Sequence, residues 1–470
     1  MKENYTPVEI KKTKYQDLVK PYIDEAIKTL KELVDINSVH DESTATSIHP
    51  FGDGVEKALS YVASLGKRLG FNVDRCDNYL TELSYGDGEK ILDIYAHCDV
   101  VPVNRKNWSF DPFNMVEQDG NFYGRGTCDD KGPGLACLYA CKALMDNNLL
   151  GGYKLRFLWG GNEERDSLCL KHYFEETKHE YPTIGFSPDA DYPLIYGEKS
   201  IYAYQADYAI SLPHVHSFNL GDALNIVLAE AECEIDIDDS LQINSLLKEY
   251  LSRYEGLSGT FDGKKLFFKG IPSHGSLPWE GVNAGLHLLN FLGILFGERR
   301  ACDIFNHYND GMGTIFNGNY KDEYFENTSY NVGRIVFDGK KVSIFVNLRF
   351  PAGLKADKVI DNVRVNTGAE VTKLGGSEGF VADPKSEFIQ TLLKAYQEET
   401  GDYESKPLAI GGGTYARESK NSVAFGAAFP GRNYRMHGDD EYFPVSDFID
   451  NIQIYAHALD KLSIYLRGKK

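Results

Sequence analysis

A histidine and an aspartate stand where an apolar segment of the sequence ends. Residues 91–96 (ILDIYA) have the composition of a buried strand, and His97 and Asp99 follow it directly. Side chains alternate along a strand, so the two residues share one face roughly 7 Å apart at Cα. Asp99 could then orient the imidazole, which favours metal binding by His97. A single His-x-Asp pair is more often a satisfied polar pair than a metal site, so the interpretation needs further ligands.

A glycine-rich turn downstream carries two adjacent acids. Residues 124–134 (GRGTCDDKGPG) deliver Asp129 and Asp130 just before an apolar helical pattern at 135–144. A helix N-cap would use one aspartate. The second aspartate is left without an ordinary explanation, and it adds a candidate ligand.

A second strand-like run, at 153–159, is followed by Glu163 and Glu164. Neighbouring residues of an extended chain point to opposite sides, so the two glutamates cannot easily perform the same task. One of them can bind metal while the other meets water or substrate. A solvated acidic turn is the ordinary alternative for such a pair. A third strand-like run, at 183–188, ends at Asp189.

These segments resemble a known family, the two-zinc exopeptidases and deacylases that include aminoacylase, carboxypeptidase G, succinyl-diaminopimelate desuccinylase and carnosinase. Within it, the resemblance is strongest to the dipeptidase V (Xaa-His dipeptidase) type. The matching segments are PFG at 50–52, HCDVVP at 97–102, GRGTCDDKGP at 124–133, NEE at 162–164, SPDADYP at 187–193, SHGS at 273–276, NLRFP at 347–351, GGGTYAR at 411–417 and FGAAFPGR at 425–432 with His437. They follow the family order over nearly the whole chain.

The resemblance implies a pair of zinc ions, with manganese or cobalt as alternatives. His97 and Asp189 would bind one ion, Glu164 and His437 the other, and Asp129 would bridge them. Nitrogen and oxygen ligands of these kinds suit zinc. The resemblance also implies a cis peptide bond after Asp129.

The same resemblance assigns the remaining roles. Glu163 would be the general base, and Asp99 would orient His97. His274 would stabilise the oxyanion, and Arg349 would bind the substrate's free carboxylate. Further substrate contacts are implied for Asn225, Gly412, Gly413 and Thr414.

Two other metal motifs compete with this set. Cys98 and Cys128 adjoin proposed ligands and could bind metal as thiolates, but the alternation at 98 directs that side chain away from the face of His97. The pair His214 and His216 has no acid at matching spacing and is expected to be a polar loop. The eight cysteines form no C-x-x-C pair and are expected to be free thiols.

Composition fits a large enzyme. The 470 residues are 42% hydrophobic and include 30 Tyr and 26 Phe, enough for more than one core. A net charge of −19 argues against nucleic acid and anionic membranes as partners. We expect a small peptide substrate. The chain shows no signal peptide and no apolar run of membrane-spanning length, so a cytoplasmic location is expected.

The predicted fold class is α/β, a two-zinc exopeptidase catalytic domain with an inserted α+β lid domain. The expected boundaries are 1–197 for the first part of the catalytic domain, 198–380 for the lid and 381–470 for the second part. The resemblance to the type with an enlarged lid favours a monomer, with a dimer as the alternative.

The sequence is compatible with three functions. The first is hydrolysis of unblocked dipeptides by a metal-bound water. The second is removal of an acyl group from N-acyl amino acids or diamino acids, which breaks the same kind of amide. The third is an inactive metal-binding or interaction protein, which loss of Glu163, Asp99 or a ligand would favour. None of these residues is lost.

Overall fold

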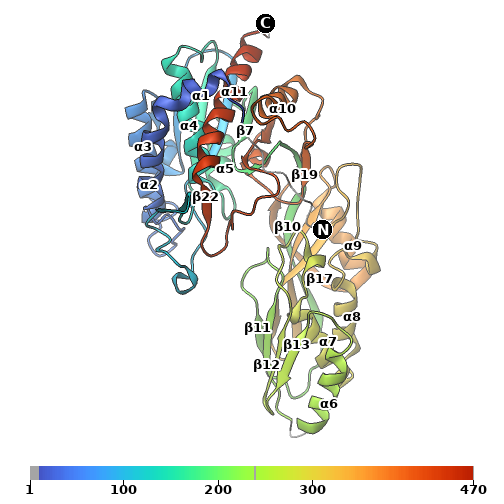
Figure 1. The fold of residues 1–470 in the computed structure, drawn as a ribbon. Helices are drawn as coiled ribbons and strands as arrows, with labels where there is room; N and C mark the ends of the chain where they lie inside the picture. The colour runs from blue at the N-terminus through green and yellow to red at the C-terminus, as the bar shows by residue number, and fades with distance from the viewer. Residues whose placement is uncertain (1–9, 238–239, 469–470) are drawn as a thin grey trace. The chain divides into compact units, whose positions relative to one another are not determined.

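The computed structural model describes residues 10–237 and 240–468, which divide into two compact units. Unit 1 comprises residues 10–196, 381–408 and 414–468, and unit 2 comprises Gly197–Phe380 and Ala409–Gly413 without the two residues at 238–239. Figure 1 draws unit 1 in blue to teal and red, and unit 2 in green to orange. The segment Ala409–Gly413, expected in the catalytic domain, groups with unit 2 because Ile410 O accepts from Lys199 N and Gly411 O accepts from Arg349 Nη1.

Unit 1 is built on a mixed sheet. Its strands run in the order β1 (Asn72–Asp74), β2 (Leu80–Tyr85), β6 (Lys154–Gly160), β3 (Ile91–His97), β7 (Ile184–Ser187), β20 (Ser422–Ala424) and β9 (Ile195–Glu198). The short strands β18 (Phe380–Val381) and β19 (Leu408–Ile410) lie where the chain passes between the units. β3 pairs in parallel with both β6 and β7, so the three predicted strands end at the same edge. Every residue of β3 is buried, which explains its continuous apolar pattern.

Helices and small sheets complete unit 1. The helices are α1 (Lys14–Val19), α2 (Ile23–Val34), α3 (Asp53–Leu69), α4 (Lys131–Asp146), α5 (Leu168–Lys171), α10 (Glu387–Thr400) and α11 (Val445–Gly468). The small sheets pair β4 (Val116–Gln118), β5 (Asn121–Tyr123) and β22 (Tyr442–Pro444), and β8 (Ala190–Asp191) with β21 (Ala427–Ala428). The helix predicted from the pattern at 135–144 is confirmed as α4.

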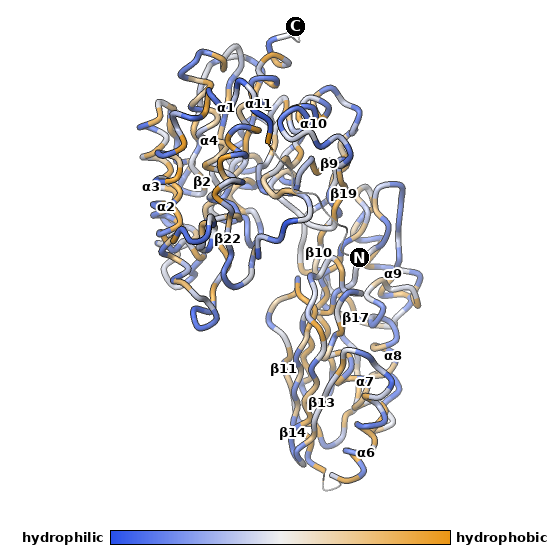
Figure 2. Tube along the Cα trace, viewed as in Figure 1, coloured by the Kyte–Doolittle hydropathy of each residue, from blue (hydrophilic) through white to orange (hydrophobic). Residues whose placement is uncertain are grey.

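Unit 2 has antiparallel sheets covered by helices. One sheet has the order β11 (Phe218–Leu220), β15 (Ser329–Phe337), β16 (Lys341–Phe350), β10 (Ser200–Ala209) and β17 (Glu370–Ser377), and the other has the order β12 (Glu230–Glu234), β14 (Lys265–Lys269) and β13 (Ser258–Phe261). The helices are α6 (Ser240–Leu251), α7 (Ala284–Phe296), α8 (Arg299–Tyr308) and α9 (Ala356–Thr367). One apolar core joins sheets and helices, and the hydrophobic colour in Figure 2 follows these strands. The predicted fold class, α/β with an inserted α+β domain, is confirmed.

Short helical turns link these elements. They are η1 (Lys20–Tyr22), η2 (Cys76–Asn78), η3 (Arg105–Asn107), η4 (His172–Glu176), η5 (Pro278–Glu280), η6 (Thr314–Phe316) and η7 (Tyr415–Glu418). Within the described ranges, no helix combines the length and the apolar character needed to cross a membrane.

Helix α4 packs so closely on the sheet that Gly134 has no room for a side chain. A Cβ at Gly134 would lie 2.5 Å from the Trp159 ring and 2.8 Å from Ala96 Cβ. We expect Gly134→Ala to lower the free energy of unfolding by about 1–3 kcal/mol, measured by urea denaturation. Gly468→Ala at the end of α11, where a Cβ meets nothing within 4 Å, is the control and should change it by less than about 0.5 kcal/mol. Equal effects of the two substitutions would contradict the packing argument.

Candidate metal centre

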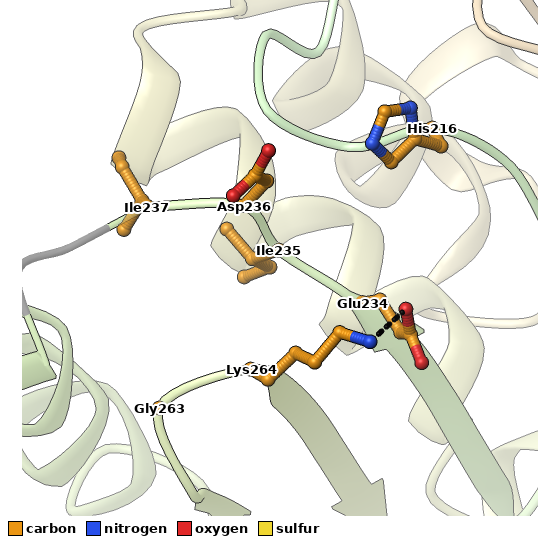
Figure 3. A pocket seen from close by; sticks show the side chains of 7 residues that line it. All are labelled: His216, Glu234, Ile235, Asp236, Ile237, Gly263 and Lys264. Atoms are coloured by element: carbon orange, nitrogen blue, oxygen red, sulfur yellow. Dashed lines mark ion pairs between the residues drawn. The ribbon is translucent and has the colours of Figure 1, made fainter.

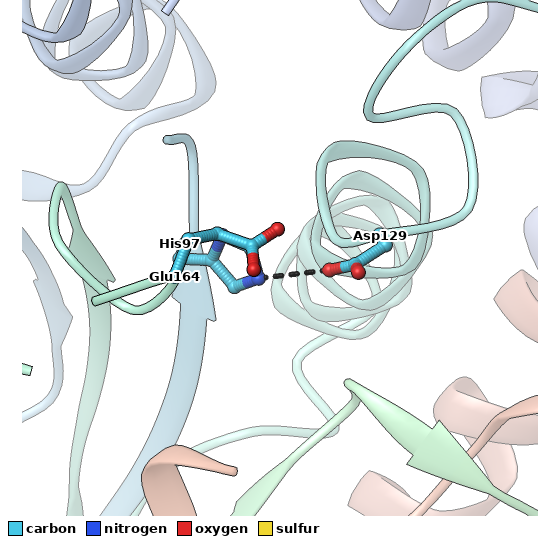
Figure 4. A group of neighbouring side chains, drawn as sticks. All are labelled: His97, Asp129 and Glu164. Atoms are coloured by element: carbon cyan, nitrogen blue, oxygen red, sulfur yellow. Dashed lines mark hydrogen bonds and ion pairs between the residues drawn. The ribbon is translucent and has the colours of Figure 1, made fainter. Parts of the chain in front are cut away.

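The first half of the centre surrounds His97, which is fully buried at the end of β3. Its Nε2 atom lies 3.1 Å from Asp129 Oδ1 and 3.5 Å from Asp189 Oδ2. Asp189 follows β7, the parallel neighbour of β3, so the sheet itself brings these two residues together. Figure 4 shows the contact between His97 and Asp129, with Glu164 beside them.

The second half surrounds His437. Its Nε2 atom lies 2.8 Å from Asp129 Oδ2 and 3.1 Å from Glu164 Oε2. The two oxygens of Asp129 therefore face different imidazoles, the geometry that a bridging carboxylate needs. The cis peptide bond expected between Asp129 and Asp130 is present. All five residues predicted as metal ligands lie in this one cluster.

The charges of the cluster are strongly coupled. Burial favours the neutral form of Asp129, but hydrogen bonds from His437 and His97 outweigh it and hold the pKa of Asp129 well below its usual range. Burial also opposes a charged His437, yet its hydrogen bonds to Asp129 and Glu164 raise its pKa to about 12. Burial and the charge of Asp129 raise the pKa of Glu164 to about 7. The carboxylates thus compete for positive charge, and divalent cations would supply it.

The two glutamates after β6 both lie at the cluster, and besides His97 they have different neighbours. Glu164 contacts His437, whereas ligand atoms of Glu163, His97 and Asp189 lie within 4.8 Å of one another. Burial and the nearby carboxylates raise the pKa of Glu163 well above its usual value, although the charge of His97 opposes this. A glutamate beside the cluster with a raised pKa suits proton transfer.

Asp99 has a broader task than the sequence indicated. The closest acceptor for His97 Nδ1 is the backbone oxygen of Asp99, at 2.9 Å, and the Asp99 carboxylate lies 3.5 Å away. That carboxylate accepts hydrogen bonds from the backbone N–H groups of Glu163 and Glu164, each at 3.1 Å. Asp99 therefore positions the glutamate pair as well as the histidine.

The cysteines contribute no ligand atom to the metal-binding groups found among residues 10–237 and 240–468. Cys98 Sγ donates to Gly160 O at 3.3 Å, away from the cluster. Burial, with nearby carboxylates, raises the pKa of Cys98 and of Cys128 above that of a free thiol. The positions of the two side chains therefore give no support to thiolate ligation.

The histidine pair of unit 2 forms no metal site within the described part of the chain. His214 packs against the ring of Phe296 at 6.0 Å. His216 lines an open pocket, where Glu234 is already paired with Lys264 at 3.0 Å (Figure 3). Both histidines lie outside helices and strands, in the segment between β10 and β11.

Apart from Thr414, the residues predicted to contact substrate form two groups in unit 2. Asn225 and His274 are neighbours. Gly275 N donates to Asn225 O at 2.6 Å, and Ile226 and His274 form an isolated antiparallel β-bridge. His274 Nδ1 lies 2.6 Å from Ser276 Oγ, which fixes the ring.

The second group surrounds Arg349. Its Nε donates to Asn347 Oδ1 at 2.8 Å and its Nη1 to Gly411 O at 2.7 Å, so Arg349 fixes the start of the segment that holds Gly412 and Gly413. The segment also joins the two groups, because a Cβ at Gly411 would lie 3.0 Å from Ser276 Cβ. Thr414 belongs to unit 1 and caps η7 through Ala416 N at 3.1 Å.

A buried ion pair that the sequence did not reveal connects the two loops of the metal centre. Glu441 accepts from Arg125 Nη1 at 2.6 Å and from the backbone N–H groups of Gly126 and Cys128 at 3.0 Å each. Arg125 in turn donates to Gly438 O at 3.0 Å, beside His437. The pair thus holds the loop of Asp129 against the loop of His437. The position of Glu441, four residues after His437, was the only sequence signal.

Removing the negative charge of Glu441 should destabilise the fold and weaken metal binding. In Glu441→Gln the buried Arg125 keeps its charge, so we expect the free energy of unfolding to fall by about 3–5 kcal/mol. In titrations with Zn²⁺ the dissociation constant of the variant should be about 10- to 100-fold higher, because both loops of the candidate centre loosen. Urea denaturation and competition with a chelating dye measure the two effects.

Two further variants make this prediction specific. Glu42→Gln breaks an exposed ion pair of similar length, Arg165 to Glu42 at 2.7 Å, and should cost at most about 1 kcal/mol. Adding Arg125→Met to Glu441→Gln should recover part of the lost stability, since it removes the unpaired charge. Strictly additive losses would show that the two residues do not act as a pair.

Comparisons with known proteins place this site in a family. Residues 94–461 match the group described as peptidase family M20/M25/M40. A protein of Bacillus subtilis (strain 168) named "Putative dipeptidase YtjP" is 32% identical over 459 residues, covering 94% of this chain and 97% of that protein. A Staphylococcus epidermidis (strain ATCC 12228 / FDA PCI 1200) protein named "Putative dipeptidase" is 33% identical over 490 residues, covering 96% and 99%.

Solved structures share the fold. Human carnosine dipeptidase 1 gives a TM-score of 0.58 at 16% identity, covering 96% of this chain and 99% of its own. The dipeptidase Dug1p from Saccharomyces cerevisiae gives 0.59 at 14% identity, covering 96% and 98%. The chain therefore belongs to peptidase family M20/M25/M40 and is a metal-dependent peptidase.

Proposed function

We propose that this peptidase hydrolyses unblocked dipeptides with a pair of divalent metal ions, zinc in the first place, and that Glu163 is its general base. The observation that carries the proposal is the carboxylate of Asp129, whose two oxygens face the two imidazoles at 3.1 and 2.8 Å. The relatives of similar length that are named as dipeptidases support the choice of substrate.

The donor set fits such a pair. Asp129, Asp189 and Glu164 offer carboxylate oxygens and His97 and His437 offer imidazole nitrogens, the ligand types that zinc accepts. His97 and Asp189 would hold one ion, Glu164 and His437 the other, with Asp129 shared. Bound there, the ions would polarise the peptide carbonyl and make water more acidic. Manganese and cobalt accept the same ligands.

Glu163 performs the proton transfers in this proposal. Its carboxylate lies beside the cluster but makes no contact with His437, which is held by Glu164 and Asp129. It takes a proton from the water that attacks the peptide carbonyl and gives that proton to the leaving amine as the C–N bond breaks. Its raised pKa favours the second of these steps, and Asp99 keeps the backbone of Glu163 in place.

The residues of unit 2 recognise the substrate in this proposal. His274 donates a hydrogen bond to the developing oxyanion, and its contact with Ser276 Oγ sets the ring direction. Arg349 binds the free carboxylate, a task for which the planar guanidinium is well suited. Asn225, Gly412 and Gly413 lie next to these two residues and provide further polar contacts. We propose that one chain supplies all of them, as in a monomer.

Substitution of the two glutamates distinguishes a base from a ligand. Glu163→Ala should lower kcat by at least about 100-fold while the protein still binds two zinc ions per chain. Glu164→Ala should instead lower the metal content, because it removes a ligand. Activity toward Ala-Ala and elemental analysis of dialysed protein measure both effects. Metal loss in the Glu163 variant would reverse the two assignments, and faster cleavage of N-acetyl-alanine than of Ala-Ala by the wild type would favour a deacylase.

The roles proposed for His274 and Arg349 predict different changes in the kinetic constants. His274→Ala should lower kcat by about 100-fold or more, as loss of an oxyanion donor does elsewhere. Arg349→Ala should mainly raise KM for Ala-Ala, with a much smaller effect on Ala-Ala-amide, which lacks the carboxylate. Steady-state kinetics with both substrates measure this split. An equal effect on the two substrates would contradict carboxylate binding by Arg349.

Mixing two inactive variants tests whether one chain is sufficient. In a monomer the His274→Ala and Glu163→Ala proteins cannot complement each other, so a mixture should be as inactive as its components. Recovered activity, assayed after co-incubation at several ratios, would establish a dimer in which each active site uses residues of both chains.

A further inference from the structure

One face of the sheet in unit 2 carries an unusual row of buried polar side chains. Ser329 lies directly opposite Arg349 in the β15–β16 pairing, and Asn331 lies opposite Asn347. Directly paired residues share a face, and residues two apart along a strand do as well. The exposed fractions of the four residues range from 0% for Ser329 to 8% for Asn347. The residues between them, Tyr330 and Leu348, belong to the apolar core on the other face.

The row has unused hydrogen-bonding capacity. Within the described chain, Ser329 Oγ and Asn331 Oδ1 are buried without a hydrogen-bond partner. The Asn331 amide nitrogen donates to Leu224 O and Ile226 O at 2.7 and 2.9 Å, which fixes the segment of Asn225. Buried polar groups are normally satisfied, so these two atoms indicate a place for a polar ligand. The Ser329 hydroxyl, opposite Arg349, can donate to an anion, whereas Asn331 Oδ1 can only accept from an N–H or O–H group of a ligand.

A lysine supplies a second positive charge to this place. Lys199 is 7% exposed, and its ammonium group donates to Asn327 O, two residues before Ser329. Its side chain also borders Gly411, since a Cβ added to that glycine would lie 3.9 Å from Lys199 Cδ. Arg349 contacts the same glycine, because its Nη1 donates to Gly411 O. Two cationic side chains thus flank the same glycine and the same end of β15.

The two charges affect each other. Burial and the charge of Arg349 lower the pKa of Lys199 to about 8, although Asp322 and Glu326 act in the opposite direction. Two cationic side chains that border the same glycine can attract an anion more strongly than one does.

We infer that Lys199 and Ser329 extend the Arg349 site into a subsite for a second carboxylate, so that the enzyme prefers dipeptides with a C-terminal aspartate or glutamate. This inference rests on the proposed function, because Arg349 is taken to bind the α-carboxylate. Lys199 then binds the side-chain carboxylate, and the Ser329 hydroxyl donates a hydrogen bond to either group.

Ala-Glu and Ala-Gln are the appropriate pair of substrates, since they have the same shape and differ in one charge. We expect wild-type kcat/KM for Ala-Glu to exceed that for Ala-Gln by at least about tenfold, the effect of one charge-assisted hydrogen bond. Lys199→Met should reduce this ratio at least fivefold, and Lys199→Arg should largely keep it. Lys340→Met is the control, because Lys340 is exposed at the turn between β15 and β16, at the other end of these strands, and should not change the ratio.

Several outcomes would overturn the inference. A wild-type ratio near one would do so without any variant, and so would an equal fall for both substrates in Lys199→Met. Because Lys199 is buried, circular dichroism and thermal melting must show that the variant is folded; if it is not, Ser329→Ala, which should lower the ratio, takes its place.

A binding measurement separates this inference from the proposed function. Calorimetric titration of the Glu163→Ala protein with each dipeptide should show tighter binding of Ala-Glu than of Ala-Gln. If the wild type cleaves neither dipeptide but this difference is present, the proposed function fails and the subsite stands. If both are cleaved equally and bound equally, the function stands and the subsite fails.

Discussion

The carboxylate of Asp129 between two imidazoles is the interaction on which the rest of unit 1 depends. It gathers four carboxylates and two histidines where most of them are removed from water, an arrangement that is unfavourable unless positive charge accompanies it. The parallel strands β3, β6 and β7 end together and bring three of the five segments to one edge. The cluster is therefore a property of the sheet as much as of its own residues.

In our proposal Asp99 and Glu441 bind no metal, but they hold in place the segments that carry the metal ligands. Asp99 accepts backbone N–H groups of the glutamate pair, and Glu441 accepts those of the loop before Asp129. Charged acceptors make stronger hydrogen bonds to N–H groups than neutral ones do, and Arg125 compensates the buried charge of Glu441. These hydrogen bonds hold ligand loops that lie outside helices and strands.

The sequence predicted those parts of the fold and of the site that are encoded locally. The strands before His97, Glu163 and Asp189 follow from short apolar runs, and α4 follows from the helical pattern after the glycine-rich turn. Glu441 could not be identified in this way, because its partners lie more than 310 residues away in the chain. The placement of Ala409–Gly413 with unit 2 likewise depends on hydrogen bonds to Lys199 and Arg349, which no local pattern encodes.

Buried polar groups in unit 2 differ from Asp99 and Glu441 in unit 1, which are used to hold loops. The sheet of unit 2 could have had an apolar second face at Ser329 and Asn331, which would have been more stable, since a buried polar atom without a partner costs about 1–3 kcal/mol. Positive charges at Lys199 and Arg349 add their own cost of burial. A peptide carboxylate could accept a hydrogen bond from the Ser329 hydroxyl and would bring negative charge next to Arg349 and Lys199. Part of the binding energy would therefore come from a buried hydroxyl that gains an acceptor, and ligand binding should stabilise unit 2.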